Sequence, residues 1–180
     1  MKSFLIIGFI CFATFQSFAQ QNTIIWDEKQ PLQWVDFSGP INDSSNFDAE
    51  SFAEVKYNYQ FITPTNFHFD VYANFNKGTS WCRRDYHSQA LLKHEQLHFD
   101  IAALFARRLK EVFDHYQYSK DYRNEIQQIF EQKKTEYHAM QHQYDEETNH
   151  SLNKDRQKDW EKYIADQLSE MKFKFNYAKQ

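Results

Sequence analysis

One stretch in the middle of the chain gives a strong helix signal. Residues 90–113 contain no Gly or Pro and are rich in Ala, Leu, Phe and other residues common in helices, so we expect a helix there. Apolar residues occupy much of its circumference: Leu91, Leu92, Phe99, Ile101, Ala102, Phe105, Leu109 and Phe113. A helix that is apolar on most sides is normally buried, so the rest of the chain must pack around it.

The same stretch carries the pentapeptide His94-Glu95-Gln96-Leu97-His98, which has the form H-E-x-x-H. Four residues are about one helical turn, so His94 and His98 project from the same face. Two imidazoles at this spacing can share one zinc ion, and Glu95 is close enough to reach a water on that ion without ligating it. Polar side chains on a buried helix are costly unless something satisfies them, and a metal would do so. A surface helix with two solvated histidines is the alternative interpretation.

The first 19 residues have the pattern of a secretory signal peptide. Lys2 provides a positive start, residues 4–15 form an apolar run too short to span a bilayer, and a small-x-small cleavage pattern ends at Ala19. We therefore expect residues 1–19 to be removed on export, and residues 20–180 to form a single domain in the periplasm or outside the cell. An uncleaved anchor is the alternative.

The exported chain is mildly acidic and almost free of cysteine. The formal charge of −4 becomes −5 when Lys2 is lost, which argues against nucleic acid or an anionic membrane surface as a partner. No second apolar run is long enough to span a membrane. Cys11 is lost with the signal peptide and Cys82 is left alone, so an internal disulfide cannot form. A bound metal is one candidate for stabilising the fold instead.

The region before the helix shows the two-residue periodicity of strands. Residues 53–61 and 67–75 alternate apolar and polar side chains and are separated by a short turn signal, so they predict an antiparallel hairpin. Residues 20–27 predict an extended entry segment, and residues 79–82 predict a further short strand. Residues 32–37 alternate less regularly and are followed by a turn signal.

Beyond this region the periodicity changes to that of helices. Either Asp85 or Ser88 can cap the first helix, which we expect to end near His115. A second helix is expected over residues 119–143, with a serine as its cap, and a third from about Lys154. A small antiparallel sheet followed by three helices defines an α+β domain.

A zinc site needs at least three protein ligands, so the two histidines of the helix motif require a partner. The polar segment 144–151 is the best source, because it follows a long helix that can fold back antiparallel to the first. From this segment we predict His150 as the third ligand, with Glu147 or Glu146 as the alternatives.

A second histidine pair and an aspartate of the first helix are further candidate ligands. His138 and His142 have the same spacing as the first pair, but Ala139 stands where the motif has its acid. We interpret this pair as a solvated helix face, with metal binding as the alternative. Asp100 lies about 200° around the helix from His98, so we expect it to hydrogen-bond to a neighbouring segment and not to ligate the same ion.

Several segments match a known bacterial family. They are Leu92-Lys93-His94-Glu95-Gln96-Leu97-His98-Phe99-Asp100-Ile101, Ser80-Trp81, Tyr144-Asp145, Thr148-Asn149-His150-Ser151, Gln157 and Trp160. With them the chain resembles the bacterial domain-of-unknown-function 922 family, over most of the expected domain. Members of this family are exported and described as zinc-dependent proteases, so the resemblance implies a zincin-like fold and a metallopeptidase role. The family pattern usually has Gly where this chain has Ser151.

These observations lead to the hypothesis of metal-assisted hydrolysis of a peptide or protein substrate. A Zn²⁺ ion held by His94, His98 and His150 would polarise the scissile carbonyl. Glu95 would take a proton from the attacking water and pass it to the leaving amine, and Tyr144 would stabilise the oxyanion. The alternatives are a non-catalytic zinc module with four protein ligands and an exported binding protein without a metal.

Overall fold

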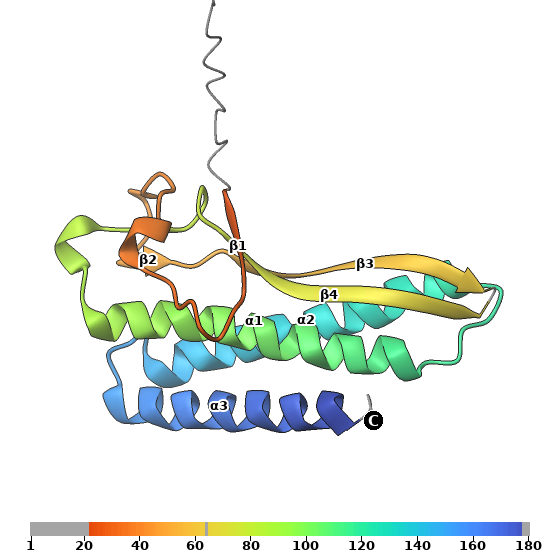
Figure 1. Cartoon of the computed structure of the whole chain (residues 1–180). Coiled ribbons are helices and arrows are strands. Elements are labelled where there is room, and N and C mark those ends of the chain that lie inside the picture. The colour runs from red at the N-terminus through yellow and green to blue at the C-terminus, as the bar shows by residue number, and fades with distance from the viewer. Residues whose placement is uncertain (1–21, 64, 178–180) are drawn as a thin grey trace, which may run out of the picture.

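Three long helices follow a small antiparallel sheet, which is the α+β order that the sequence predicts (Figure 1). The computed structural model describes residues 22–63 and 65–177, so the predicted signal peptide, residues 1–19, lies outside the described residues. The elements are β1 (Thr23–Ile25), η1 (Trp34–Asp36), β2 (Ala49–Glu50), β3 (Ala53–Thr63), β4 (Asn66–Asn76), β5 (Trp81–Cys82), η2 (Arg84–Tyr86), α1 (Gln89–His115), α2 (Tyr122–Thr148) and α3 (Lys154–Tyr177).

The predicted hairpin is the longest part of the sheet. β3 pairs antiparallel with β4, from Ala53 opposite Phe75 to Thr63 opposite Asn66, and β1 pairs with the other edge of β4. Phe69 and Phe75 on the inner face of β4 are fully buried, as the alternation requires. β5 pairs with β2 in a second, two-stranded sheet, and β2 is a strand that the sequence did not predict.

The predicted central helix is confirmed. α1 contacts β3 and β4 on one side and α2 and α3 on the others, so it lies between the hairpin and α3 (Figure 1). Of the two predicted caps, Ser88 is the one used, because its hydroxyl accepts a hydrogen bond from the Leu91 N–H at 3.1 Å. Ile101, Leu104 and Leu109 are fully buried, and each contributes about 2 kcal/mol of hydrophobic stabilisation.

The segment before the hairpin lies across α1. The Trp26 indole donates to Asp100 Oδ1 at 2.7 Å, and the Leu32 N–H donates to Gln96 Oε1 at 2.7 Å. The prediction that Asp100 hydrogen-bonds to a neighbouring segment is therefore confirmed. Residues 34–36, inside the stretch with irregular alternation, form a turn of 3₁₀ helix. These contacts fix one side of the helix that carries the H-E-x-x-H motif.

The second helix is longer than the sequence predicted. We expected it to end near Gln143, but α2 continues to Thr148. Tyr144 and Thr148 are fully buried, so the inner face of the helix continues for another turn. The helix ends where Asn149 takes a left-handed conformation, with φ of 46°. In the described part of the chain, no helix is both long and apolar enough to cross a membrane.

Candidate metal centre

His94 and His98 of α1 meet Asp145 of α2 at one point. The two Nε2 atoms are 3.3 Å apart. Asp145 Oδ1 lies 3.2 Å from His94 Nε2 and 3.0 Å from His98 Nε2. Three potential ligand atoms from two helices therefore form a nearly equilateral triangle, and together they could hold a metal ion.

Two glutamine amides fix the orientation of the imidazoles. His98 Nδ1 lies 2.6 Å from Gln141 Oε1, while the nitrogen of the same amide donates to the His98 carbonyl. His94 Nδ1 lies 3.2 Å from Gln157 Oε1, an oxygen that also accepts the Tyr144 hydroxyl. Because both Nδ1 atoms face acceptors, both must carry the hydrogen, and the two Nε2 atoms keep their lone pairs. This is the tautomer that a metal-ligating histidine needs.

With both imidazoles neutral, the three converging atoms are all acceptors, with no donor between them. Asp145 Oδ1 is buried and has no hydrogen-bond partner among the described residues. Lone pairs this close repel one another, and a cation among them removes the repulsion. Without a metal, a proton on one of the imidazoles has to separate these lone pairs. Burial alone would lower the pKa of His98, but the Asp145 carboxylate outweighs it and raises this pKa to about 9.

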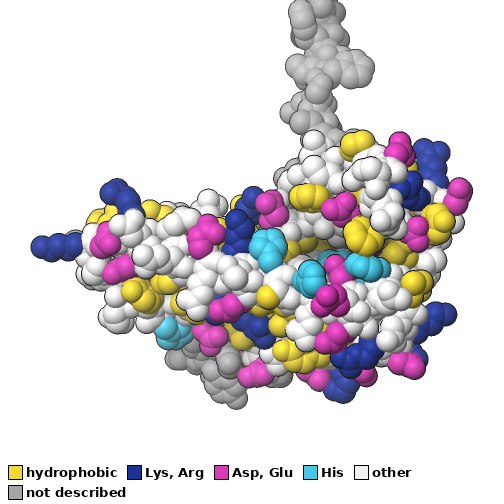
Figure 2. All heavy atoms as spheres, turned by 180° about the vertical axis from the view of Figure 1, so that it is seen from behind, with side chains coloured by type: hydrophobic (Ala, Val, Ile, Leu, Met, Phe, Trp, Pro, Cys, Tyr) yellow, Lys and Arg dark blue, Asp and Glu magenta, His cyan; other side chains and the backbone are white. Residues whose placement is uncertain are grey.

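Glu95 lies beside the triad with an unpaired oxygen. Glu95 is only 3% exposed, and its Oε2 has no hydrogen-bond partner within the described part of the chain. Glu95, both histidines and Asp145 line one cleft of about 660 Å³. Figure 2 shows histidine and acidic side chains gathered in a hollow on this face. A buried carboxylate oxygen without a donor is costly, so its retention here points to a chemical role.

His150 lies next to the triad but outside it. Its Nδ1 is 3.6 Å from Asp145 Oδ1, its ring packs on Phe47 with the centroids 4.5 Å apart, and its side chain is about half exposed. The structure therefore brings Asp145, and not the predicted His150, to the two histidines. Asp145 belongs to the segment from which the sequence predicts the third ligand, and ligation by His150 stays a prediction.

The two alternative ligands are engaged elsewhere. Glu147 accepts a hydrogen bond from the Trp160 indole at 3.0 Å, on the side of α2 that faces α3. Glu146 is exposed and pairs with His142 at 3.3 Å. Neither belongs to the group of residues that could hold a metal.

Tyr144, which we predicted as the oxyanion donor, is fully buried behind the imidazoles. Its ring stacks on His94 with the centroids 4.7 Å apart. Its hydroxyl, which has one hydrogen to donate, lies 2.8 Å from Gln157 Oε1 and 3.1 Å from the His94 carbonyl oxygen. Burial raises the pKa of this hydroxyl, so it stays protonated and keeps donating. Tyr144 is not among the residues that line the cleft and packs against the His94 ring, and its role as oxyanion donor stays a prediction.

Sequence reasoning missed Asp145 because it ended the second helix too early. A signal was present, since Tyr137, Tyr144 and Thr148 follow one another at intervals of seven and four residues, which is one helix face. Extending the helix along this face places Asp145 one turn after Gln141, whose amide supports His98.

The turn after α2 is conformationally unusual. Asn149, His150 and Ser151 all have positive φ, at 46°, 49° and 76°. The Asn149 and His150 N–H groups donate to the carbonyls of the last helical turn, which closes the helix and reverses the chain toward α3. Positive φ is costly for residues with a Cβ, so glycine would be favoured at the position of Ser151.

The fold and the site together define an α+β protein with a possible metal centre of two histidines and an aspartate. The chain belongs to the family "Bacterial protein of unknown function (DUF922)", whose profile matches residues 53–151, more than half of the chain. The matched region runs from β3 to the turn after α2, so it includes all three potential ligands. Among curated proteins and solved structures, none is significantly similar to this chain.

Proposed function

We propose that this chain is an exported, zincin-like metallopeptidase that hydrolyses peptide bonds, with His94, His98 and Asp145 as zinc ligands. The observation that supports this most is the triangle of acceptor atoms, with sides of 3.0 to 3.3 Å. Tetrahedral zinc with ligands at 2.0–2.1 Å separates its ligand atoms by about 3.3 Å, so the triangle has the size that the ion requires. The signal-peptide pattern of residues 1–19 supports export.

The chain's own residues have separate roles in this proposal. When bound, zinc polarises the scissile carbonyl and makes water a better nucleophile. Glu95 accepts the proton of the attacking water and passes it to the leaving amine, since its free Oε2 is a base inside the cleft. Gln141 and Gln157 hold the imidazoles so that both Nε2 atoms face the ion. Three protein ligands leave a coordination position for water or substrate, as hydrolysis requires.

The test is a zinc-loaded preparation of the exported chain and its Glu95→Gln variant, assayed on a pool of unstructured peptides by mass spectrometry. We expect equal zinc content and a rate at least about a hundredfold lower in the variant. Glu131→Gln, an equivalent change on the exposed face of α2, is the matched control and should cleave like the parent. Unchanged cleavage by Glu95→Gln, or no cleavage by the zinc-loaded parent, would contradict the proposal.

A non-catalytic zinc module is the second candidate, and the position of His150 favours it. With Nδ1 3.6 Å from Asp145 Oδ1, a rotation of this half-exposed side chain would add a fourth protein ligand and close the site. His150→Ala separates the two functions. A peptidase with three protein ligands keeps its zinc in this variant, whereas a closed structural site loses it and unfolds at a lower temperature.

A further inference from the structure

From the lining of the cleft we infer that the substrates are peptides that combine basic residues with large apolar ones near the bond that is cut. This inference rests on the proposed function and adds the substrate class. Its starting point is Glu95, whose unpaired, buried oxygen marks the cleft as the place where a ligand is received.

The cleft is negatively charged. The described residues that line it include five acids and no Lys or Arg; the acids are Asp48, Glu50, Glu54, Glu95 and Asp145. Glu54 pairs with Lys56 at 2.8 Å, which balances one of the five charges, and a bound divalent cation neutralises two more, so a formal charge of −2 is left. Asp48 and Glu50 form no ion pair within the described part of the chain, so their charges are not balanced locally. A concave wall of one sign concentrates the field and attracts cationic groups.

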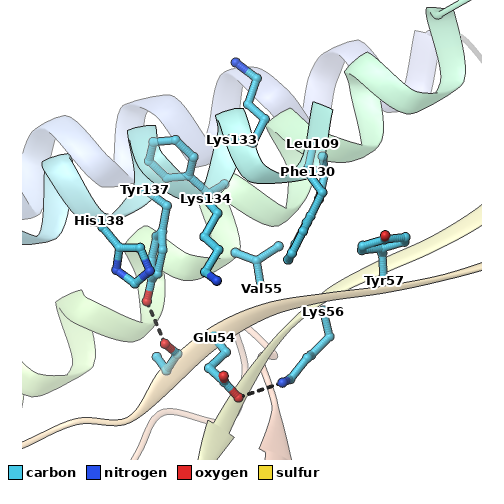
Figure 3. A pocket seen from close by; sticks show the side chains of 12 residues that line it. Glu54, Val55, Lys56, Tyr57, Leu109, Phe130, Lys133, Lys134, Tyr137 and His138 are labelled. Carbon is cyan, nitrogen blue, oxygen red and sulfur yellow. Dashed lines mark hydrogen bonds and ion pairs between the residues drawn. The ribbon is translucent and has the colours of Figure 1, made fainter. Parts of the chain in front are cut away.

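An adjoining hollow differs from the cleft in being bordered by lysines. This second cavity, of about 340 Å³, lies between β3 and α2 and is bordered by Lys56, Lys133 and Lys134 (Figure 3). The Tyr137 hydroxyl donates to the Ala53 carbonyl at 2.7 Å where the two cavities meet (Figure 3). Each lysine pairs with an acid, Lys56 with Glu54, Lys133 with Glu136 and Lys134 with Glu131, so their charges are balanced. The unbalanced negative charge therefore lies on the side of the potential metal ligands.

The rim of the cleft is apolar. Phe47, Phe52 and Leu152 line it and are 44%, 47% and 73% exposed. They come from both sides, two from the segment around β2 and one from the turn between α2 and α3. Large apolar side chains kept in water beside a cleft are typical of binding surfaces, since they gain stability only when covered. A peptide with both basic and large apolar residues satisfies the acidic wall and this rim together.

The preference for basic substrates is tested with three peptides that differ only at the two positions flanking the cleaved bond. Both positions are Lys in the first peptide, Gln in the second and Glu in the third. For the zinc-loaded chain we expect kcat/KM to be at least about tenfold higher for the Lys peptide than for the Glu peptide at low salt. The ratio should shrink at about 1 M salt, where the Debye length is roughly 3 Å. Asp48→Asn combined with Glu50→Gln should lower the ratio severalfold; the glutamine can still accept from the Trp81 indole.

Asp70→Asn combined with Glu131→Gln changes the net charge equally but outside the cleft lining, and should leave the ratio unchanged. A ratio near one in the parent, or an equal loss in this control, would overturn the inference. Cleavage of the neutral Gln peptide tests the proposed peptidase function by itself, independently of the charge preference. Equilibrium binding of the three peptides to zinc-loaded Glu95→Gln gives the same ranking without turnover, so discrimination is measurable even where cleavage is absent.

The apolar rim is tested with Leu152→Ser, which removes the most exposed of the three rim side chains. We expect the preference for a Lys peptide with Leu next to the cleaved bond, over the same peptide with Ala, to fall severalfold. The Lys-to-Glu ratio should stay as in the parent. A Leu-to-Ala preference that is absent in the parent, or unchanged by the substitution, would remove the apolar part of the inference.

Discussion

Two pairs of histidines in this protein share a four-residue spacing and have opposite surroundings. His94 and His98 project from α1 into the interior, with their Nε2 atoms 3.3 Å apart and a carboxylate between them. His138 and His142 lie on α2, where the His142 side chain is 73% exposed and pairs with Glu146. No group of potential metal ligands among the described residues includes the second pair.

The difference shows that a four-residue spacing alone does not bring two histidines together with a third potential metal ligand. Each imidazole of the α1 pair has a glutamine oxygen at Nδ1, which fixes the tautomer and turns Nε2 toward its neighbours. His142 Nδ1 instead meets a carboxylate in solvent, and within the described part of the chain no amide orients either ring of the α2 pair. Burial, a fixed tautomer and a third acceptor are what the first pair adds to the shared geometry.

The largest expected effect is the loss of metal on removal of a ligand. We expect His94→Ala or Asp145→Ala to weaken zinc binding at least about a hundredfold, because a ligand of a three-ligand site supplies several kcal/mol. His142→Ala, the matched change on the exposed pair, should bind zinc like the parent. Isothermal titration with a competing chelator measures the zinc affinity of all three variants. A loss of zinc binding in His142→Ala would contradict the contrast between the two histidine pairs.

The next largest effect is expected from removing the glutamine amide that orients the His94 ring. Gln157→Leu removes the acceptor of His94 Nδ1 and of the Tyr144 hydroxyl, so we expect zinc affinity to fall about 10- to 100-fold. Gln157→Glu keeps an acceptor and should stay within a few fold of the parent. Gln127→Leu, on the solvent side of α2, is the control. Equal zinc affinity in Gln157→Leu and Gln127→Leu would show that the spacing of the histidines binds zinc without orientation by the Gln157 amide.

The proton that bridges His98 and Asp145 in the metal-free protein predicts a pH dependence of metal binding. The pKa of His98 is about 9, so zinc must displace this proton at neutral pH. Zinc affinity should therefore rise by about tenfold per pH unit from pH 6.5 and level off above about pH 9. Affinity that is flat over this range would mean that no proton is held between the two side chains.

The stability of the metal-free protein should change in the opposite direction. Since the folded pKa of His98 lies above the unfolded value, its contribution is complete below pH 6.5 and is lost as the pH rises through about 9. The unfolding free energy should fall by on the order of 1 kcal/mol per pH unit in this window. Urea unfolding of metal-free protein measures this fall, and Asp145→Asn, which removes the carboxylate, should flatten it.

The smallest expected effect concerns the turn that follows Asp145. Ser151 has φ of 76°, where Gly is favoured, so Ser151→Gly should raise the unfolding free energy by about 0.5–1 kcal/mol. Ser169→Gly, at an exposed position inside α3, should instead lower it by a similar amount. Destabilisation by both substitutions would show that the turn is not strained.

The sequence predicted what depends on local periodicity. The β3–β4 hairpin, the three helices and the Ser88 cap follow from alternation, helical stripes and capping preferences, and all of them are present. The pairing of His94 with His98 is also local, because one helical turn brings them together. The contribution of Asp145 depends on how α2 lies against α1, and that alignment comes from tertiary packing. The role of Gln157 is harder still to predict from the sequence, since this residue comes from a third helix.

That third helix makes completion of the site depend on residues beyond the two helices that carry the potential ligands. The family profile stops at residue 151, yet α3 begins at Lys154 and provides the oxygen that holds the His94 ring. A fragment cut at the family boundary would keep every ligand atom and lose this support. Since α3 follows both helices that carry the potential ligands, the orientation of the His94 ring by Gln157 forms only once the first turn of α3 has docked.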